Sequence, residues 1–291
     1  GHQSKSLRLE SNDGKQYVMR ALRKSAIKFL QTTAFQDNFV EEDLEGSYAE
    51  SFLSDFYTTA HPYTSTTIGA LSDAVDIYHS NPELYYIPKQ EALGAYNDEY
   101  GDELYIIEER VESSHKDLES FGKPHKILST TDVLQEIQKT GKEIVDEPSY
   151  IRARLFDMLI GDWDRHEDQW RWALFKKEDG SEICKPIPRD RDQAFSIFDG
   201  SVLSFLRCAI PSLRMMQSFD EELPSPKWFS FEPYPLDMTF INQSNWEDWE
   251  REAKTLQNGI TDEVIENAFK NLPEEIKGQT IEDIKRKLKG R

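Results

Sequence analysis

The sequence predicts an α+β protein with two lobes: a small, β-rich first lobe with one main helix, and a mostly helical second lobe. Two patterns indicate this fold class. Near the N-terminus apolar residues alternate with polar ones on both sides of a tight turn, whereas later segments repeat apolar residues at helical spacing. A polar stretch with Gly122 and Pro124 lies where the strand-like alternation gives way to helical spacing. We therefore expect lobes at residues 1–112 and 113–291, which together form one domain.

Four elements are expected in the first lobe. Residues 6–24 predict a β-hairpin around the Asn-Asp-Gly turn that starts at Asn12. Residues 46–62 predict a helix, because aromatic residues recur along one face until a His-Pro pair ends the pattern. Residues 84–94 and 103–112 predict two further strands.

The second lobe begins with helix signals. Ser129 and Asp132 form the pattern of a capping box, and a second helix is expected after Asp146 that ends near Gly161. Two strands joined by a short turn should follow, and then three helices. The strands are predicted at residues 169–177 and 183–190, and the helices at residues 245–257, 261–272 and 280–290.

Composition excludes some functions. The net charge of -19 disfavours nucleic-acid binding, because phosphates require clustered Lys and Arg. No apolar run approaches the ~18 residues of a membrane span. Two cysteines cannot build a disulfide framework. The initial Gly-His resembles a cloning remnant, so we expect the domain to come from a larger protein, and its oligomeric state stays open.

Acidic residues concentrate on both sides of the predicted strand pair. Asp164 follows the helix that ends near Gly161, and the second strand leads into Asp190 and Asp192. Carboxylates that converge in this way suit a hard cation such as Mg²⁺ or Mn²⁺. In phosphoryl transfer, one loop carboxylate accepts a proton and an oxygen-bearing residue five positions later holds metal, a spacing that Asp164 and Gln169 fit.

These motifs carry a resemblance to a known group. The segments "IGDWDRHEDQ" and "PRDRDQAF" resemble the catalytic and metal-binding motifs of atypical protein kinases, chiefly the Fam20 and CotH kinases and more distantly HipA and type II phosphatidylinositol 4-kinases. A Fam20-like loop reads G-N-x-D-R-H, and a CotH-like metal segment reads W-D-x-D-x-A-F. The matching positions are Gly161, Asp162, Asp164, Arg165 and His166, then Asp190, Asp192, Ala194 and Phe195, with Asp162 in the Asn place.

The resemblance implies a bilobal protein-kinase-like fold and a role for each residue. Asp164 would be the catalytic base, and ATP would bind with Mg²⁺ or Mn²⁺. Asp190 would hold the metal, together with Gln169 and Asp192. Arg20 or Lys24 would contact the nucleotide phosphates, aligned by Glu50 or Asp55, and the backbone from Ile107 to Glu109 would contact adenine.

The expected activity is ATP- and metal-dependent phosphoryl transfer to a hydroxyl of a protein, a sugar or a lipid. Arg20 stands where kinases have Lys, and no glycine-rich loop is present. Alternatives are therefore an inactive kinase-like binding module, a metal-dependent phosphohydrolase, or acids that pair structurally with Arg165, Arg189 or Arg191. The chain also resembles a region of bacterial proteins with a metallophosphoesterase domain and an outer-membrane barrel, which implies an extracytoplasmic or envelope-associated setting.

Overall fold

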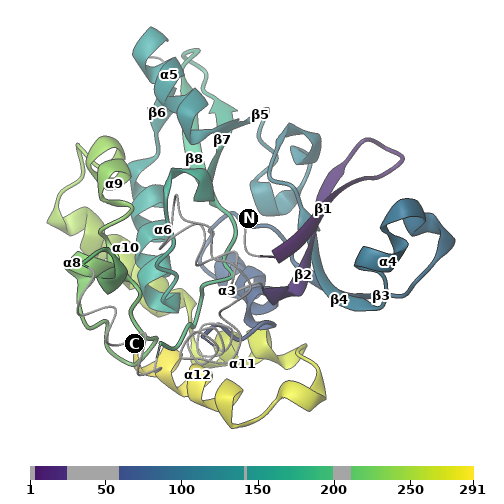
Figure 1. Cartoon of the computed structure of the whole chain (residues 1–291). Coiled ribbons are helices and arrows are strands. Elements are labelled where there is room, and N and C mark those ends of the chain that lie inside the picture. Colours follow the sequence, from purple (N-terminus) through teal and green to yellow (C-terminus); the bar gives the residue numbers. More distant parts are fainter. Residues whose placement is uncertain (1–3, 25–58, 141–142, 199–210) are drawn as a thin grey trace.

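The computed structural model describes residues 4–24, 59–140, 143–198 and 211–291. It has a β-sheet in its first part and a second part rich in helices (Figure 1). The α+β organisation expected from the sequence is confirmed. Most of the helix predicted at residues 46–62, including Glu50 and Asp55, lies outside the described residues. None of the described helices combines the length and apolar character of a membrane-spanning segment.

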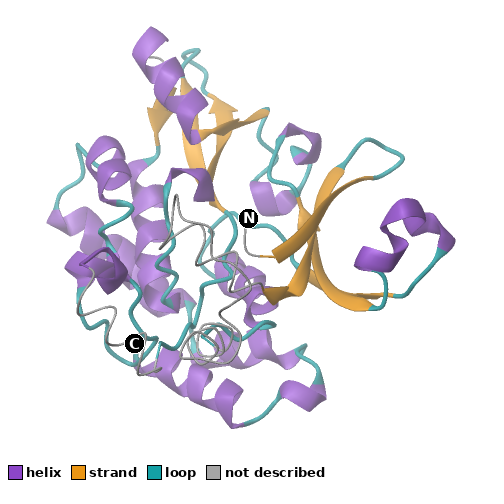
Figure 2. Ribbon diagram, viewed as in Figure 1, coloured by secondary structure: helices purple, strands orange, loops and turns teal. Residues whose placement is uncertain are grey.

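The first sheet has four antiparallel strands in the order β1-β2-β4-β3 (Figure 2). The predicted hairpin is confirmed as β1 (Ser4–Glu10) and β2 (Gln16–Lys24). The strand predicted at residues 84–94 is shorter, because β3 (Glu83–Ile87) ends before Pro88, which has no N–H for the ladder. Strand β4 (Glu103–Glu109) lies between β2 and β3.

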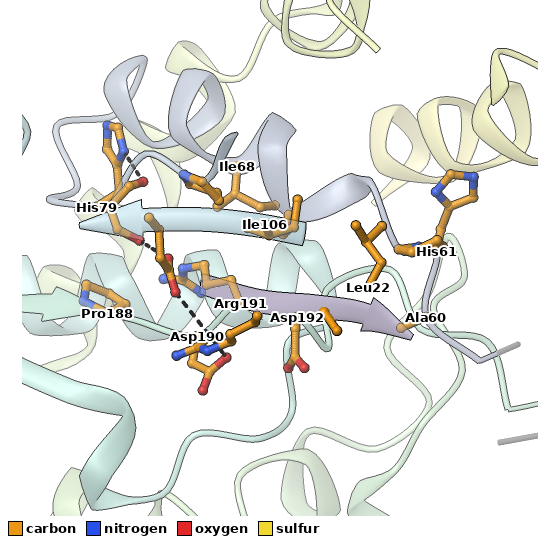
Figure 3. A pocket seen from close by; sticks show the side chains of 17 residues that line it. Leu22, Ala60, His61, Ile68, His79, Ile106, Pro188, Asp190, Arg191 and Asp192 are labelled. Carbon is orange, nitrogen blue, oxygen red and sulfur yellow. Dashed lines mark hydrogen bonds and ion pairs between the residues drawn. The ribbon is translucent and has the colours of Figure 1, made fainter. Parts of the chain in front are cut away.

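Side chains alternate between the two faces of this sheet. On one face Met19 and Tyr105 are buried, and Ile107 packs against them. Arg20, Ile106 and Glu108 occupy the opposite face, where a cavity lies (Figure 3).

A second four-stranded sheet lies in the helical part, in the order β5-β7-β8-β6. The sequence predicted only its central hairpin, β7 (Trp170–Lys176) and β8 (Glu182–Pro188). Strand β5 (Lys126–Ser129) pairs antiparallel with β7, and β6 (Glu143–Val145) pairs parallel with β8. These flanking strands have four and three residues, too few for a recognisable alternation.

The two helices expected before the predicted strand pair are confirmed. In α5 (Thr130–Thr140), Ser129 Oγ accepts from the backbone N–H of Asp132 at 3.1 Å, and the Asp132 carboxylate accepts from Ser129 in return. The long helix α6 (Glu147–Ile160) begins at the capping residue Asp146 and ends at Gly161, where φ is 71°. Its far end therefore delivers the chain into the acidic loop.

The C-terminal helices are confirmed as α10 (Trp246–Gly259), α11 (Asp262–Lys270) and α12 (Gln279–Gly290). Their buried side chains join Phe156, Ile160 and Phe195 in the largest core. The short helix α3 (Ile68–Asp73) contributes Ile68 and Leu71 to the same core, although it comes early in the chain. Further short helices are α4 (Asn97–Tyr100), α8 (Pro226–Phe229) and α9 (Tyr234–Phe240). Turns of 3₁₀ helix lie at Thr64–Thr67, Glu91–Tyr96, Ser113–His115, Glu119–Phe121, Glu167–Gln169, Pro211–Met215 and Glu274–Ile276.

An aromatic cluster fixes the second sheet against α6. Trp170 and Trp172 are fully buried, and their rings lie 5.1 and 5.8 Å from the ring of Tyr150. Phe240 of α9 closes the cluster at 4.7 Å from Trp172. Buried aromatic groups of this kind contribute large apolar areas to a core. The tryptophans next to the acidic loop are therefore structural residues of a rigid support.

Candidate functional site

The acidic loop leaves α6 through Gly161, whose positive φ suits a residue without a side chain. Asp164 lies in this loop and its carboxylate is partly exposed. His166 Nδ1 accepts from the backbone N–H of Asp168, and its Nε2 lies 3.9 Å from Asp164 Oδ1. His166 thus braces the loop, and its ring faces the proposed catalytic base.

A buried ion network lies beneath the loop. Arg191 Nη1 lies 2.5 Å from Asp157 Oδ1 and 3.1 Å from Asp162 Oδ2. Arg165 Nη1 lies 3.2 Å from the same Asp162 oxygen, and Arg154 Nη1 donates to Asp157 at 2.8 Å. Arg191 therefore pairs with neither Asp164 nor Asp190 in these contacts, but joins α6 to the segment that carries Asp190.

Asp162 is the perturbed acid of this network. Its complete burial raises the pKa to about 7, although the neighbouring guanidinium groups of Arg165 and Arg191 oppose the shift. Arg165 also donates to the carbonyl oxygens of Arg189 and Gln169, at 2.9 and 2.8 Å. The network consequently fixes both chain segments of the predicted metal site.

Gln169 and Asp190 lie at the same end of the second sheet. The backbone N–H of Arg189 donates to the carbonyl of Gln169 at 3.0 Å, and Asp190 is the next residue. Asp190 has a φ of 58°, in the left-handed region that non-glycine residues seldom adopt. Such conformations concentrate at functional sites, where the surrounding structure enforces them.

Arg20 reaches Asp190 from the first sheet. Its Nη1 lies 2.7 Å from Asp190 Oδ1 and 3.0 Å from Glu108 Oε1. Burial alone would lower the pKa of the Arg20 guanidinium, but the carboxylates of Asp190 and Glu108 outweigh that effect and raise it above its ordinary value. The predicted phosphate-binding cation and the predicted metal acid therefore meet, although 170 positions separate them.

A cavity of about 430 Å³ surrounds this contact (Figure 3). Its polar end carries Arg20, Glu108, Asp190 and Asp192. Its remaining wall is largely apolar and comes from β2, β4 and the chain around α3. Among the residues of that wall are Leu22, Ala60, Pro62, Ile68, Pro82 and Ile106. A cavity with an apolar wall and a few convergent charges is the usual form of a small-molecule site.

Among the other predicted site residues whose side chains the structure describes, none lines the cavity. Gln169 is buried, and Asp164 lies in the loop before β7. Lys24 ends β2, and its side chain is not described. Ile107 packs on the opposite face of the first sheet, and Glu109 accepts from the backbone N–H of Asn81 at 2.7 Å.

Glu108 is a charged site residue that the sequence prediction missed. It lies between Ile107 and Glu109, inside the segment expected to contact adenine. The alternation of side chains along β4 places it on the face of Arg20, and this alternation was the signal available in the sequence.

The residues at the polar end fit a hard divalent cation. Asp190 and Asp192 carry carboxylates at one end of the cavity, and Asp190 already balances the positive charge of Arg20 (Figure 3). No group of three or more His, Cys, Asp or Glu in the described residues is arranged to hold a metal. Mg²⁺ needs no such group, because it commonly takes one or two protein carboxylates and completes its shell with water and substrate phosphates.

Comparisons with known proteins give remote similarities. No protein-family model matches the chain, and no curated protein matches it. The Helicobacter pylori proinflammatory kinase CtkA shares 12% identity, with 97% of this chain and 88% of that chain covered and a TM-score of 0.46. The Rio2 kinase of Chaetomium thermophilum, solved as an ADP/Mg²⁺-phosphoaspartate complex, shares 11% identity over 99% of this chain and 68% of that one, with a TM-score of 0.38. The specific resemblance to the Fam20 and CotH kinases that the sequence motifs indicate stays a prediction.

Proposed function

We propose that this chain is a kinase-like protein that binds ATP with Mg²⁺ or Mn²⁺ at the polar end of the cavity and transfers a phosphoryl group to a hydroxyl acceptor. The observation that carries the proposal is the contact of Arg20 with Asp190. It joins a cation of the first sheet to an acid that follows the second sheet, at one wall of a cavity large enough for a small ligand. An arginine binds phosphate through a planar fork of donors.

Each polar residue has a task in this proposal. Asp190, Asp192 and Gln169 would hold the divalent ion, which neutralises charge on the transferred phosphoryl group. Arg20 would bind the phosphates. Asp164, on the braced loop, would accept the proton of the acceptor hydroxyl. The acceptor belongs to a protein, a sugar or a lipid, and an envelope-associated setting is part of the same proposal.

An inactive binding module is the second candidate, and Arg20 is the observation that favours it. The guanidinium is bulkier than the ammonium of lysine, and it holds the very carboxylate that the metal would need. Such a module would bind nucleotide without transferring phosphate, or would bind none.

A thermal-shift titration tests the nucleotide site. The wild type, Asp190→Ala and a control, Asp98→Ala, are titrated with ATP in the presence of Mg²⁺ or Mn²⁺. Asp98 suits the control because it is almost fully exposed and does not line the cavity. A ligand that binds only the folded state stabilises it by about 2.7 kcal/mol at a hundred times its Kd.

We expect metal-dependent stabilisation of the wild type and of Asp98→Ala, and its loss in Asp190→Ala. If no nucleotide stabilises the wild type, the nucleotide site does not exist. If Asp190→Ala is stabilised as much as the wild type, the nucleotide binds without the proposed metal acid.

A further inference from the structure

Glu108 is held in place from two sides. Its Oε1 lies 3.0 Å from Arg20 Nη1, and its Oε2 accepts from Ser80 Oγ at 2.6 Å. Only 11% of its side chain is exposed. In the pairing of β2 with β4, Arg20 lies opposite Ile106, and Glu108 lies two residues further on, so both charged side chains lie on one face. A buried carboxylate with two fixed partners has a single orientation.

One nitrogen of Arg20 serves two carboxylates. Nη1 contacts Glu108 at 3.0 Å and Asp190 at 2.7 Å. The first contact lies within one sheet, between neighbouring strands, whereas the second links the first sheet to the segment that follows the second sheet. The contact of Arg20 with Glu108 therefore does not depend on how the first sheet lies relative to the second. It also remains possible when the Asp190 carboxylate binds a different cation.

A largely buried guanidinium needs a partner at all times, because an unpaired buried charge is costly. The Arg20 side chain is 22% exposed and that of Asp190 is 15% exposed. If a divalent ion occupies Asp190, Glu108 is the carboxylate that remains for Arg20 among the contacts described above. Without Glu108, Arg20 would be drawn fully to Asp190, where it would oppose the metal and turn away from the phosphates.

We propose that Glu108 is the positioning residue of Arg20: it holds the guanidinium toward the nucleotide phosphates when Asp190 takes up the divalent ion. This inference rests on the proposed function, because it requires ATP and a metal ion at the cavity. It assigns to a strand residue the task that the sequence had given to Glu50 or Asp55, which lie outside the described residues.

The test compares the binding of ATP and of adenosine, in the presence of Mg²⁺, by isothermal titration calorimetry. The variants are Glu108→Gln, Arg20→Met, the double variant and the control Glu103→Gln. Glu103 lies on the same strand and also forms an ion pair, with Lys5 at 2.5 Å, but it does not line the cavity. Adenosine lacks phosphates, so its affinity reports the cavity without the group that Arg20 contacts.

We expect Glu108→Gln to weaken ATP binding by roughly tenfold, which corresponds to ~1.4 kcal/mol, and to leave adenosine binding within about twofold. Glu103→Gln should change neither affinity. In the Arg20→Met background, Glu108→Gln should have no further effect on ATP, because the residue that it positions is gone. Glu108→Asp keeps a carboxylate and should recover part of the lost ATP affinity.

Three results would overturn the inference while the nucleotide site stands: Glu108→Gln binds ATP like the wild type, weakens adenosine as much as ATP, or has its full effect without Arg20. The proposed function fails separately, and this inference with it, if the wild type binds no ATP. Circular dichroism of each variant shows whether it is folded, and Glu108→Asp provides the comparison if Glu108→Gln does not fold.

Discussion

Removal of Arg191 should destabilise the folded protein strongly. Its guanidinium lies 2.5 Å from Asp157 and 3.1 Å from Asp162, and the side chains of both acids are fully buried. In Arg191→Met the two carboxylates stay buried with one cation fewer. Breaking a buried ion pair from one side typically costs about 3–5 kcal/mol, because the remaining charge has lost its compensation.

The cost should depend on pH. The pKa of Asp162 is raised to about 7 by burial, so this carboxyl is mostly protonated and neutral at pH 6 and mostly charged at pH 8, where it needs the positive charge of Arg191 more. We therefore expect Arg191→Met to lower the free energy of unfolding by about 3 kcal/mol at pH 6, the lower end of the range above, and by more at pH 8. Urea unfolding followed by circular dichroism gives the free energy of unfolding at each pH.

Arg251→Met is the matched control for this measurement. Arg251 also contacts two acids, Asp248 and Glu252, but its own side chain is 54% exposed on α10, and the buried Glu252 keeps its contact with Arg152 at 2.8 Å when Arg251 is removed. Exposed ion pairs contribute little to stability, so this variant should unfold at nearly the wild-type urea concentration. A loss below about 1 kcal/mol in Arg191→Met at both pH values would refute the view that this network holds the site together.

Two further predictions concern the same loop. The pKa of Asp162 is about 7 in the folded protein and ~3.9 in the unfolded chain, so the folded state binds the proton more tightly. The contribution of this proton to the free energy of unfolding is therefore fully present below about pH 4 and is lost as the pH rises through 7. Asp162→Asn, which does not titrate, should therefore flatten the fall in the free energy of unfolding over this range, and an unchanged slope would assign it to another group. Gly161→Ala should destabilise by about 1 kcal/mol or more, because φ is 71° and the new Cβ would lie 3.0 Å from Phe219; a wild-type melting temperature would contradict this.

Local signals in the sequence sufficed for many elements of the fold. The turn near Asn12 identified the first hairpin, and Asp146 and Gly161 marked the ends of α6, because a turn or a cap depends on a few adjacent residues. Strands β5 and β6 were missed for the opposite reason. They are short, and they exist because they pair with β7 and β8, which no local pattern reveals.

The candidate site was predictable only in part. The acids that follow the predicted strand pair led to Asp190 and Asp192, and the resemblance to kinases led to Arg20; all three line the cavity. Glu108 was missed because a hinge-like segment was expected to use its backbone, whereas the alternation of side chains along β4 turns the Glu108 carboxylate toward Arg20. An ion network around Arg165 and Arg191 was among the alternatives, but its member Asp157 was missed, because Asp157 meets Arg191 through tertiary packing across 34 positions.

The most direct test of phosphoryl transfer follows the γ-phosphate of radiolabelled ATP in single-turnover reactions of the wild type and Asp164→Asn. Asp164 does not line the cavity, so Asp164→Asn should still bind ATP with Mg²⁺. Binding by both proteins is measured first. We predict that the wild type releases or transfers the label and that Asp164→Asn, although it binds ATP, is slower by about 10²-fold or more. Equal rates would contradict the role of Asp164 as the base, and a wild type that binds ATP but never loses the label would be an inactive binding module.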